Sequence, residues 1–116
     1  MRLIDTSVWI DHLRTPNFQL TEWLITDQVL NHPFVTGELA CGNLRDRKNF
    51  LSALARLPSA VVASNPEVLH LIEAGKLHGR GLGWIDAHLL ASARLSGCRL
   101  QTRDVRLSQA ALELGV

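Results

Sequence analysis

Short apolar segments alternate with longer segments of helical periodicity along this chain, and this alternation restricts its fold more than any other feature. The apolar segments are too short for helices, whereas the intervening segments carry apolar residues at spacings of three and four. Strands that alternate with helices in this way form parallel sheets covered by helices on both faces. We therefore expect an α/β domain of three layers, with a short central parallel sheet made of strands at residues 2–4, 29–31, 60–63 and 98–101.

Capping and helix-breaking residues predict where the helices begin and end. Thr6 and Ser7 predict the start of the first helix, and Pro33 predicts the start of another. Pro58 and Gly97 each end a helix. The length of 116 residues suffices for one domain with its own core, so we expect a single domain over residues 1–116. The expected helices cover residues 8–14, 20–27, 33 onward, 50–57, 65 onward, 85–95 and 105–114.

Four acidic residues occupy positions where isolated carboxylates are unusual. Asp5 follows the first strand directly and Asp104 follows the last, so both open onto the rim at the carboxyl ends of the parallel strands. Asp86 lies in the first turn of its helix, on the side of the apolar stripe, and Glu38 lies on the apolar face of the helix that Pro33 begins. The topology therefore predicts that the four side chains meet.

Each of these acids also has an ordinary structural explanation. Asp5 and Asp104 can cap helices, Asp86 can interact with a helix dipole, and Glu38 can extend to solvent or form an ion pair. Together the four favour a cation, because two carboxylates about 5 Å apart repel by about 3 kcal/mol at an effective dielectric constant of about 20. Mg²⁺ or Mn²⁺ suits such oxygen ligands, whereas the five scattered histidines do not indicate zinc. A site of this kind supports the attack of water on a phosphodiester.

Composition adds little about function but indicates a compartment. The net charge of +1 argues neither for nor against nucleic-acid binding, although ten of the twelve cationic residues are arginines, which suit phosphate. Two cysteines without a C-x-x-C spacing suit a reducing compartment. The sequence shows neither a signal peptide nor an apolar run of membrane-spanning length, so we expect a cytoplasmic protein. The hydrophobic content of 47% indicates either a partner or dimer surface or a dense helical core.

Three motifs resemble those of the PIN domain, and more narrowly those of the VapC-type toxins of bacterial toxin–antitoxin pairs. They are LIDTSVWIDHLR, VTGELACGNL and LGWIDAHLLASARLSGCRLQTRDVRL, and in this order they cover nearly the whole chain apart from a less distinctive stretch between about residues 45 and 77. The resemblance implies a PIN-like nuclease domain acting as an endoribonuclease that depends on Mg²⁺ or Mn²⁺. The substrate would be RNA, hydrolysed by metal-activated water. The family suggests a structured loop of tRNA or ribosomal RNA.

The resemblance also implies roles for individual residues. Asp5 and Asp86 would be the principal metal ligands, Glu38 would bind the metal directly or through water, and Asp104 would help to hold a second position or a water molecule. Among hydroxyl residues, Thr102 would support Asp5 and Asp104, and Thr6 matches the residue after the first acid. The family further implies a homodimer and an inhibitory antitoxin that lays a helix across the toxin and places a basic side chain in the acidic pocket.

Two other classes of protein remain open. A non-catalytic module that binds an antitoxin or RNA could retain a vestigial acidic pocket, but the complete set of acids favours catalysis. A metal-dependent DNA nuclease of related architecture is disfavoured by the small size of the chain and the lack of a DNA-binding appendage.

Basic residues near the acids are candidates for binding RNA phosphates. Arg45 lies in a polar bend at residues 45–48, and Lys76 and Arg80 lie in the glycine-rich segment 75–83, which we expect to be a mobile loop. A solvated polar bend is an equal explanation for residues 45–48. We expect His12 and His88 to face solvent on their helices. The tryptophans are expected to be core or dimer residues, with Trp84, close to Asp86, as the exception worth testing.

Overall fold

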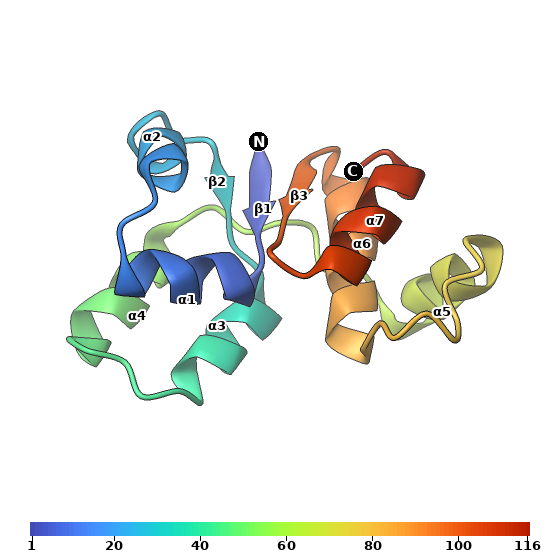
Figure 1. The fold of residues 1–116 in the computed structure, drawn as a ribbon, viewed down its shortest axis with the longest axis horizontal. Helices are drawn as coiled ribbons and strands as arrows, with labels where there is room; N and C mark the ends of the chain where they lie inside the picture. Colours follow the sequence, from blue (N-terminus) through green and yellow to red (C-terminus); the bar gives the residue numbers. More distant parts are fainter.

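The computed structural model describes residues 1–116 and contains one three-stranded sheet with seven helices around it (Figure 1). None of these helices has the length and apolarity needed to cross a membrane. In chain order the elements are β1 (Arg2–Ile4), α1 (Thr6–Arg14), α2 (Phe18–Ile25), β2 (Val29–Leu30), α3 (Pro33–Ala40), α4 (Arg47–Arg56), α5 (Asn65–Ala74), α6 (Trp84–Ser96), β3 (Arg99–Gln101) and α7 (Val105–Leu114).

The sheet is parallel, with the strand order β2-β1-β3. The central strand β1 pairs Leu3 with Leu30 on one side and with Leu100 on the other, and the side chains of Leu3 and Ile4 are fully buried. In Figure 1, α1 and α7 lie on the near side of the sheet and α6 lies on the far side. This arrangement confirms the predicted three-layer α/β class with a short central parallel sheet.

Helix α6 is the most enclosed element of the fold. All seven of its residues from 87 to 93 are buried, and the helix contacts α5, α7, β1 and β3. It ends where predicted, because Gly97 adopts a left-handed conformation with φ of 63° that terminates the helix. One hydrophobic core of 25 buried residues runs through the molecule.

The predicted strand at residues 60–63 is wrong. The segment makes only one parallel bridge to the sheet, between Asn31 and the preceding residue Ser59, and then leaves it. Ala60 N–H still donates to the Asn31 carbonyl at 2.8 Å, but beyond it the partners come from α6: Val61 N–H donates to the Ser96 hydroxyl at 2.9 Å and Ala63 N–H donates to the Ser92 hydroxyl at 3.3 Å. The apolar run therefore predicts an extended segment correctly but assigns it the wrong hydrogen-bond partners.

Three predicted helix starts are also wrong. Helix α2 begins at Phe18 instead of residue 20, because Asn17 caps it through its side chain. Helix α1 begins two residues early, at Thr6, with Asp5 at the N-cap position, so the hydroxyls of Thr6 and Ser7 do not cap it. They bond to carboxylates instead. Helix α4 begins at Arg47, within the segment expected to be a bend, and Asp46 before it takes a left-handed conformation with φ of 48°.

His32 connects α3 to α6 from a fully buried position. Its Nδ1 accepts a hydrogen bond from Phe34 N–H at 3.0 Å, so in the neutral ring the proton is on Nε2, which donates to the Ser92 hydroxyl at 3.1 Å. Burial, with a smaller contribution from His88, lowers the pKa of His32 from 6.5 to about 4. The folded protein therefore holds this ring neutral.

We expect acid to destabilise the fold through His32. The unfolded chain binds a proton at the ordinary pKa of 6.5 and the folded chain only near 4, so the unfolded state binds more protons between these values and stability falls as pH falls. The loss should be about 1.4 kcal/mol per pH unit and about 3 kcal/mol in total. Urea unfolding between pH 7 and pH 4 measures it. His32→Asn, which retains an N-cap acceptor, should flatten this dependence, whereas the exposed-site change His70→Asn should not; equal slopes in all three proteins would contradict the assignment.

Candidate active site

Asp5 lies at the carboxyl end of the central strand and is 7% exposed. Its N–H bonds to the carbonyl of Gln101 at 2.9 Å, which fixes it beside the end of β3. Its Oδ2 accepts two hydrogen bonds at 2.7 Å, one from the Ser7 hydroxyl and one from the Thr102 hydroxyl. Its Oδ1 has no protein donor, so the carboxylate is held in place with one oxygen available.

The hydroxyls around Asp5 also position the segment that carries Asp104. Thr102 Oγ1 accepts from Asp104 N–H at 3.0 Å, and Ser7 Oγ accepts from Arg103 N–H at 3.0 Å. Asp104 caps α7 as predicted, because its Oδ1 accepts the N–H groups of Arg106 and Leu107. Ser7, expected only to start the helix, is thus a residue of the site. The signal for this was its position, since a hydroxyl two residues after the first acid, at the start of a helix, can face the neighbouring strand end.

Glu38 reaches the same region from α3. Its Oε1 accepts a hydrogen bond of 2.6 Å from Thr6, the residue directly after Asp5. Contrary to the predicted inward face, Glu38 is exposed, because the apolar residues that anchor α3 in the core are Val35 and Leu39. Because Thr6 directly follows Asp5 in the chain, its hydrogen bond holds the exposed Glu38 near the buried Asp5.

Asp86 lies in the first turn of α6, where its Oδ2 accepts the N–H of Gly83 at 2.9 Å. Burial raises the pKa of Asp86, the Gly83 hydrogen bond opposes this, and the charges of Asp5 and Asp104 raise it further. Three of the four acids are thus within electrostatic reach of one another, although they are 18 to 99 residues apart in the sequence.

The four carboxylates share one pattern of hydrogen bonding. Each uses one oxygen to accept from protein donors and leaves its second oxygen without a protein donor. No three histidine, cysteine or acidic side chains are close enough together to form a complete metal-binding cluster by themselves. What supports Mg²⁺ or Mn²⁺ is the chemistry of the donors, since Mg²⁺ takes oxygen ligands, often only one or two carboxylates together with several waters, whereas a structural zinc takes cysteine and histidine. The carboxylate oxygens therefore fit Mg²⁺ or Mn²⁺, the metals that the sequence implies.

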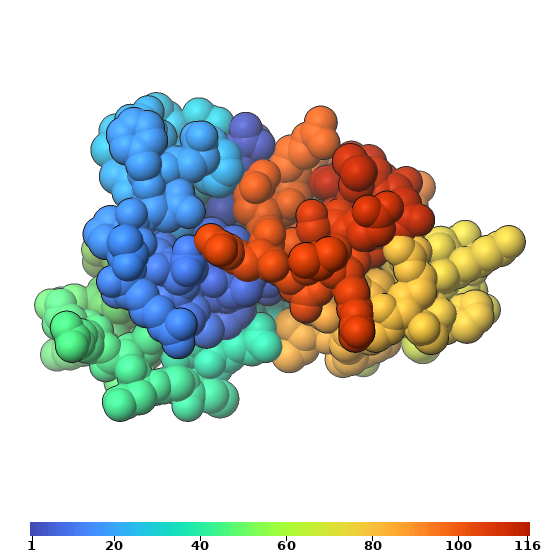
Figure 2. All heavy atoms as spheres, in the orientation of Figure 1, coloured from blue at the N-terminus to red at the C-terminus, as the bar shows by residue number.

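The predicted basic residues lie in two separate parts of the molecule. Arg80 forms an ion pair with Glu113 of α7, whereas Lys76 is exposed and adopts a left-handed conformation with φ of 51°. A second ion pair, between Arg103 and Asp11 at 2.8 Å, joins the segment before α7 to α1, and Figure 2 shows these two parts of the surface, orange and blue, meeting.

Arg45 lies on the other side, at a groove of about 600 Å³ that adjoins Glu38. Ile10 and Leu13 of α1 contribute to its apolar lining, and Arg14 lies beside them. Arg14 and Arg45 form no ion pair with a carboxylate of the chain. The groove thus combines aliphatic side chains with two unpaired cations directly next to an acid of the site.

The expectation that His88 faces solvent is wrong. Its ring is 1% exposed, packed edge-on against Phe34 and Trp84 at 4.7 Å between ring centroids, and neither of its nitrogens has a hydrogen-bond partner. The reason is that Phe34 of α3 packs on the side of α6 that carries His88, although this side is not part of the apolar stripe of the helix. Burial lowers the pKa of His88. Of the tryptophans, Trp9 is in the core, and Trp84 is 43% exposed beside Asp86.

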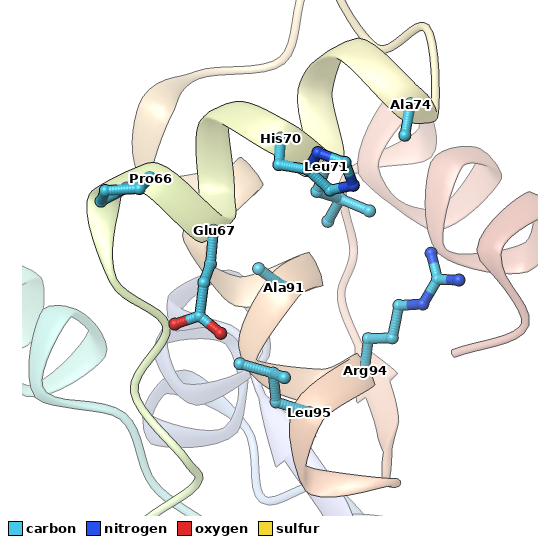
Figure 3. Close-up of a pocket in the computed structure, with 8 residues that line it drawn as sticks. All are labelled: Pro66, Glu67, His70, Leu71, Ala74, Ala91, Arg94 and Leu95. Atoms are coloured by element: carbon cyan, nitrogen blue, oxygen red, sulfur yellow. The ribbon is translucent and has the colours of Figure 1, made fainter.

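Another hollow, of about 490 Å³, lies between α5 and α6 and contains none of the four acids (Figure 3). Leu71, Ala91 and Leu95 form its apolar part, while His70 and Arg94 lie at its edge. Leu69 and Leu95 are 55% and 47% exposed, so this side of the molecule presents apolar surface away from the acids.

The chain as a whole matches a known family. The PIN domain matches residues 2–113, and the chain therefore belongs to the PIN-domain family. Two relatives, each called Ribonuclease VapC32 and found in Mycobacterium tuberculosis strains CDC 1551/Oshkosh and ATCC 25618/H37Rv, are 48% identical over 117 residues. The alignment covers 100% of this chain and 94% of each relative, which confirms the resemblance to the VapC type.

A solved structure has the same fold. The crystal structure of FitAcB from Neisseria gonorrhoeae superposes with a TM-score of 0.66 at 22% identity, covering 96% of this chain and 93% of that chain.

Proposed function

We propose that this chain is the endoribonuclease toxin of a type II toxin–antitoxin pair, and that it hydrolyses RNA phosphodiester bonds with Mg²⁺ or Mn²⁺. The observation that carries the proposal is the set of four carboxylates at one edge of the sheet, each held through one oxygen and free at the other. The 48% identity to proteins called Ribonuclease VapC32 supports RNA as the substrate. We also propose that residues 1–116 form one nuclease domain around the single core, acting in the cytoplasm.

In this proposal Asp5 and Asp86 hold the metal, Glu38 contributes directly or through water, and Asp104 orients a water molecule. The metal supplies positive charge that polarises a phosphoryl oxygen and makes water a better nucleophile near neutral pH. The protein contributes positioning. Ser7 and Thr102 hold one oxygen of Asp5, Thr6 holds one of Glu38, and Gly83 holds one of Asp86, so that the second oxygen of each carboxylate is left for the metal or its water.

We propose two protein partners for the surfaces outside the acids. An antitoxin segment with aliphatic and acidic side chains suits the groove beside Glu38, because Arg14 and Arg45 there have no ion-pair partner. A second copy of the chain suits the apolar side formed by α5 and α6.

Cleavage assays with labelled RNA test the proposed function. We expect cleavage with Mg²⁺ or Mn²⁺, none after EDTA treatment, and recovery when Mn²⁺ is restored. A DNA oligonucleotide of the same sequence serves as the control and should remain intact. RNA binding without cleavage under any metal condition would favour the non-catalytic module, and cleavage that resists EDTA would overturn the metal-dependent reaction.

A further inference from the structure

Arg106, in the first turn of α7, packs on a glycine of the loop before α6. Gly81 has φ of +77°, and a Cβ built there would lie 3.0 Å from both Cδ and Cζ of Arg106 and closer still to its Nη1. Nearby Gly79 has a similar φ of +70°, yet nothing lies within 4 Å of its Cβ position. Position 79 therefore needs glycine only for its backbone, whereas position 81 needs it also to make room for the guanidinium.

The guanidinium of Arg106 has no protein partner. The two ion pairs of the chain use Arg80 with Glu113 and Arg103 with Asp11. Only the backbone N–H of Arg106 is hydrogen-bonded, to Asp104 Oδ1 at 2.9 Å. Helix stability does not explain the residue either, because a cation in the first turn of a helix faces the positive end of the helix dipole. Its five N–H donors are therefore available to a ligand.

The position of Arg106 indicates what that ligand is. The residue lies two positions after Asp104, and Gly81 lies two positions before Gly83, whose N–H holds Asp86. Figure 2 shows the surface of α7, in red-orange, adjoining that of this loop, in yellow. The guanidinium is thus packed between the segments that carry two of the acids. Four carboxylates repel a polyanion, so a fixed cation at their edge compensates for part of this repulsion.

We infer that Arg106 binds a phosphate of the RNA beside the acidic site, and that Gly81, which has no side chain, leaves the space in which its guanidinium packs. The inference rests on the proposed function. A guanidinium suits the task because its planar donors can bind two phosphate oxygens at once. Arg80, the basic residue favoured from the sequence, is less suitable because Glu113 already pairs with it. Phosphate binding of this kind contributes affinity without reading the base sequence.

RNA binding measured in the Asp5→Asn background, with EDTA present, tests the inference without requiring cleavage. Fluorescence anisotropy of a labelled single-stranded RNA at several salt concentrations should show about tenfold weaker binding for Arg106→Ala. The slope of log K against log salt should fall by about 1. Arg106→Lys should retain most of the slope, because it keeps the charge.

The glycines provide a matched pair of variants. Gly81→Ala and Gly79→Ala impose the same left-handed strain on the backbone, but only Gly81→Ala displaces Arg106. We expect Gly81→Ala to weaken RNA binding as Arg106→Ala does, and Gly79→Ala to bind like the parent protein. If Gly81→Ala fails to fold, Arg106→Ala decides alone, since it alters an exposed side chain.

The outcomes separate this inference from the proposed function. Wild type is assayed in parallel for RNA cleavage with Mn²⁺. If wild type cleaves RNA and Arg106→Ala binds with unchanged affinity and salt slope, the role of Arg106 is wrong and the nuclease assignment stands. If wild type neither cleaves nor binds RNA, the proposed function fails and the inference fails with it.

Discussion

Replacing Asp5 by asparagine should lower RNA cleavage by more than about a hundredfold, since even groups that only orient a metal ligand contribute about 10- to 100-fold. Asparagine keeps the shape of the side chain, and its carbonyl can still accept hydrogen bonds from Ser7 and Thr102. What it loses is the charge of the oxygen that has no protein donor. The variant therefore tests the metal-binding role separately from the packing around the site.

The same variant should fold at least as stably as wild type. The charge of Asp5 raises the pKa of Asp86, so the two carboxylates repel each other in the folded protein. Removing one charge relieves this repulsion, and thermal unfolding at pH 7 should show an equal or higher Tm. Loss of activity together with retained or increased stability is typical of a functional site.

Mn²⁺ should stabilise the wild type and not the variant. A ligand that binds only the folded state adds about 2.7 kcal/mol at a hundred times its Kd, so the Tm of wild type should rise with Mn²⁺ concentration. Asp27→Asn is the matched control, because Asp27 is exposed, precedes β2 at the opposite edge of the sheet, and has a φ of 55° that asparagine tolerates. An Asp5→Asn protein that cleaves RNA at the wild-type rate would remove Asp5 from the mechanism.

The convergence of the acids could be predicted from the sequence because parallel strands place their carboxyl ends at one edge. Asp5 and Asp104 follow neighbouring strands, β1 and β3, and Asp86 lies in the first turn of the helix that precedes β3. The topology alone therefore brings three acids together. Glu38 was harder to place, because its approach depends on one hydroxyl of Thr6 and not on an apolar face.

Long-range contacts account for what the sequence did not reveal. His88 has the pattern of an exposed position on α6, and only the arrival of Phe34 from α3 encloses it. Arg106 looks like an ordinary surface residue until the fold places Gly81 under its guanidinium. In both cases the partner is more than 20 residues away and has no periodic relation to the residue in question.

The extended segment after α4 also depends on contacts that are distant in the sequence. Residues 60–63 have the apolar composition of a strand, but Ser92 and Ser96, one turn apart on α6, take two of their N–H groups. The Ser92 hydroxyl is fully buried and serves two partners, since it also accepts from His32 Nε2. This one oxygen therefore connects α6 to both α3 and the extended segment.

Replacing Ser92 by alanine should destabilise the protein by about 2–4 kcal/mol, because it leaves His32 Nε2–H and Ala63 N–H buried without acceptors. The higher helix propensity of alanine offsets only about 0.5 kcal/mol of this. Ser96→Ala makes the same change one turn later, but its partner is the N–H of Val61, a residue that is 52% exposed, so water can replace the hydroxyl. Its cost should stay below about 1 kcal/mol.

Urea unfolding of both variants at pH 7 measures the difference directly. A larger loss for Ser92→Ala than for Ser96→Ala means that the buried hydroxyl, and not the serine composition of α6, holds the extended segment against the helix. Equal losses of unfolding free energy in the two variants would mean that water also reaches the position of the Ser92 hydroxyl. Water would then replace Ser92 as the acceptor for the Nε2 proton of His32. In that case the acid sensitivity expected from His32 should also weaken in Ser92→Ala, because a hydrated ring is easier to protonate.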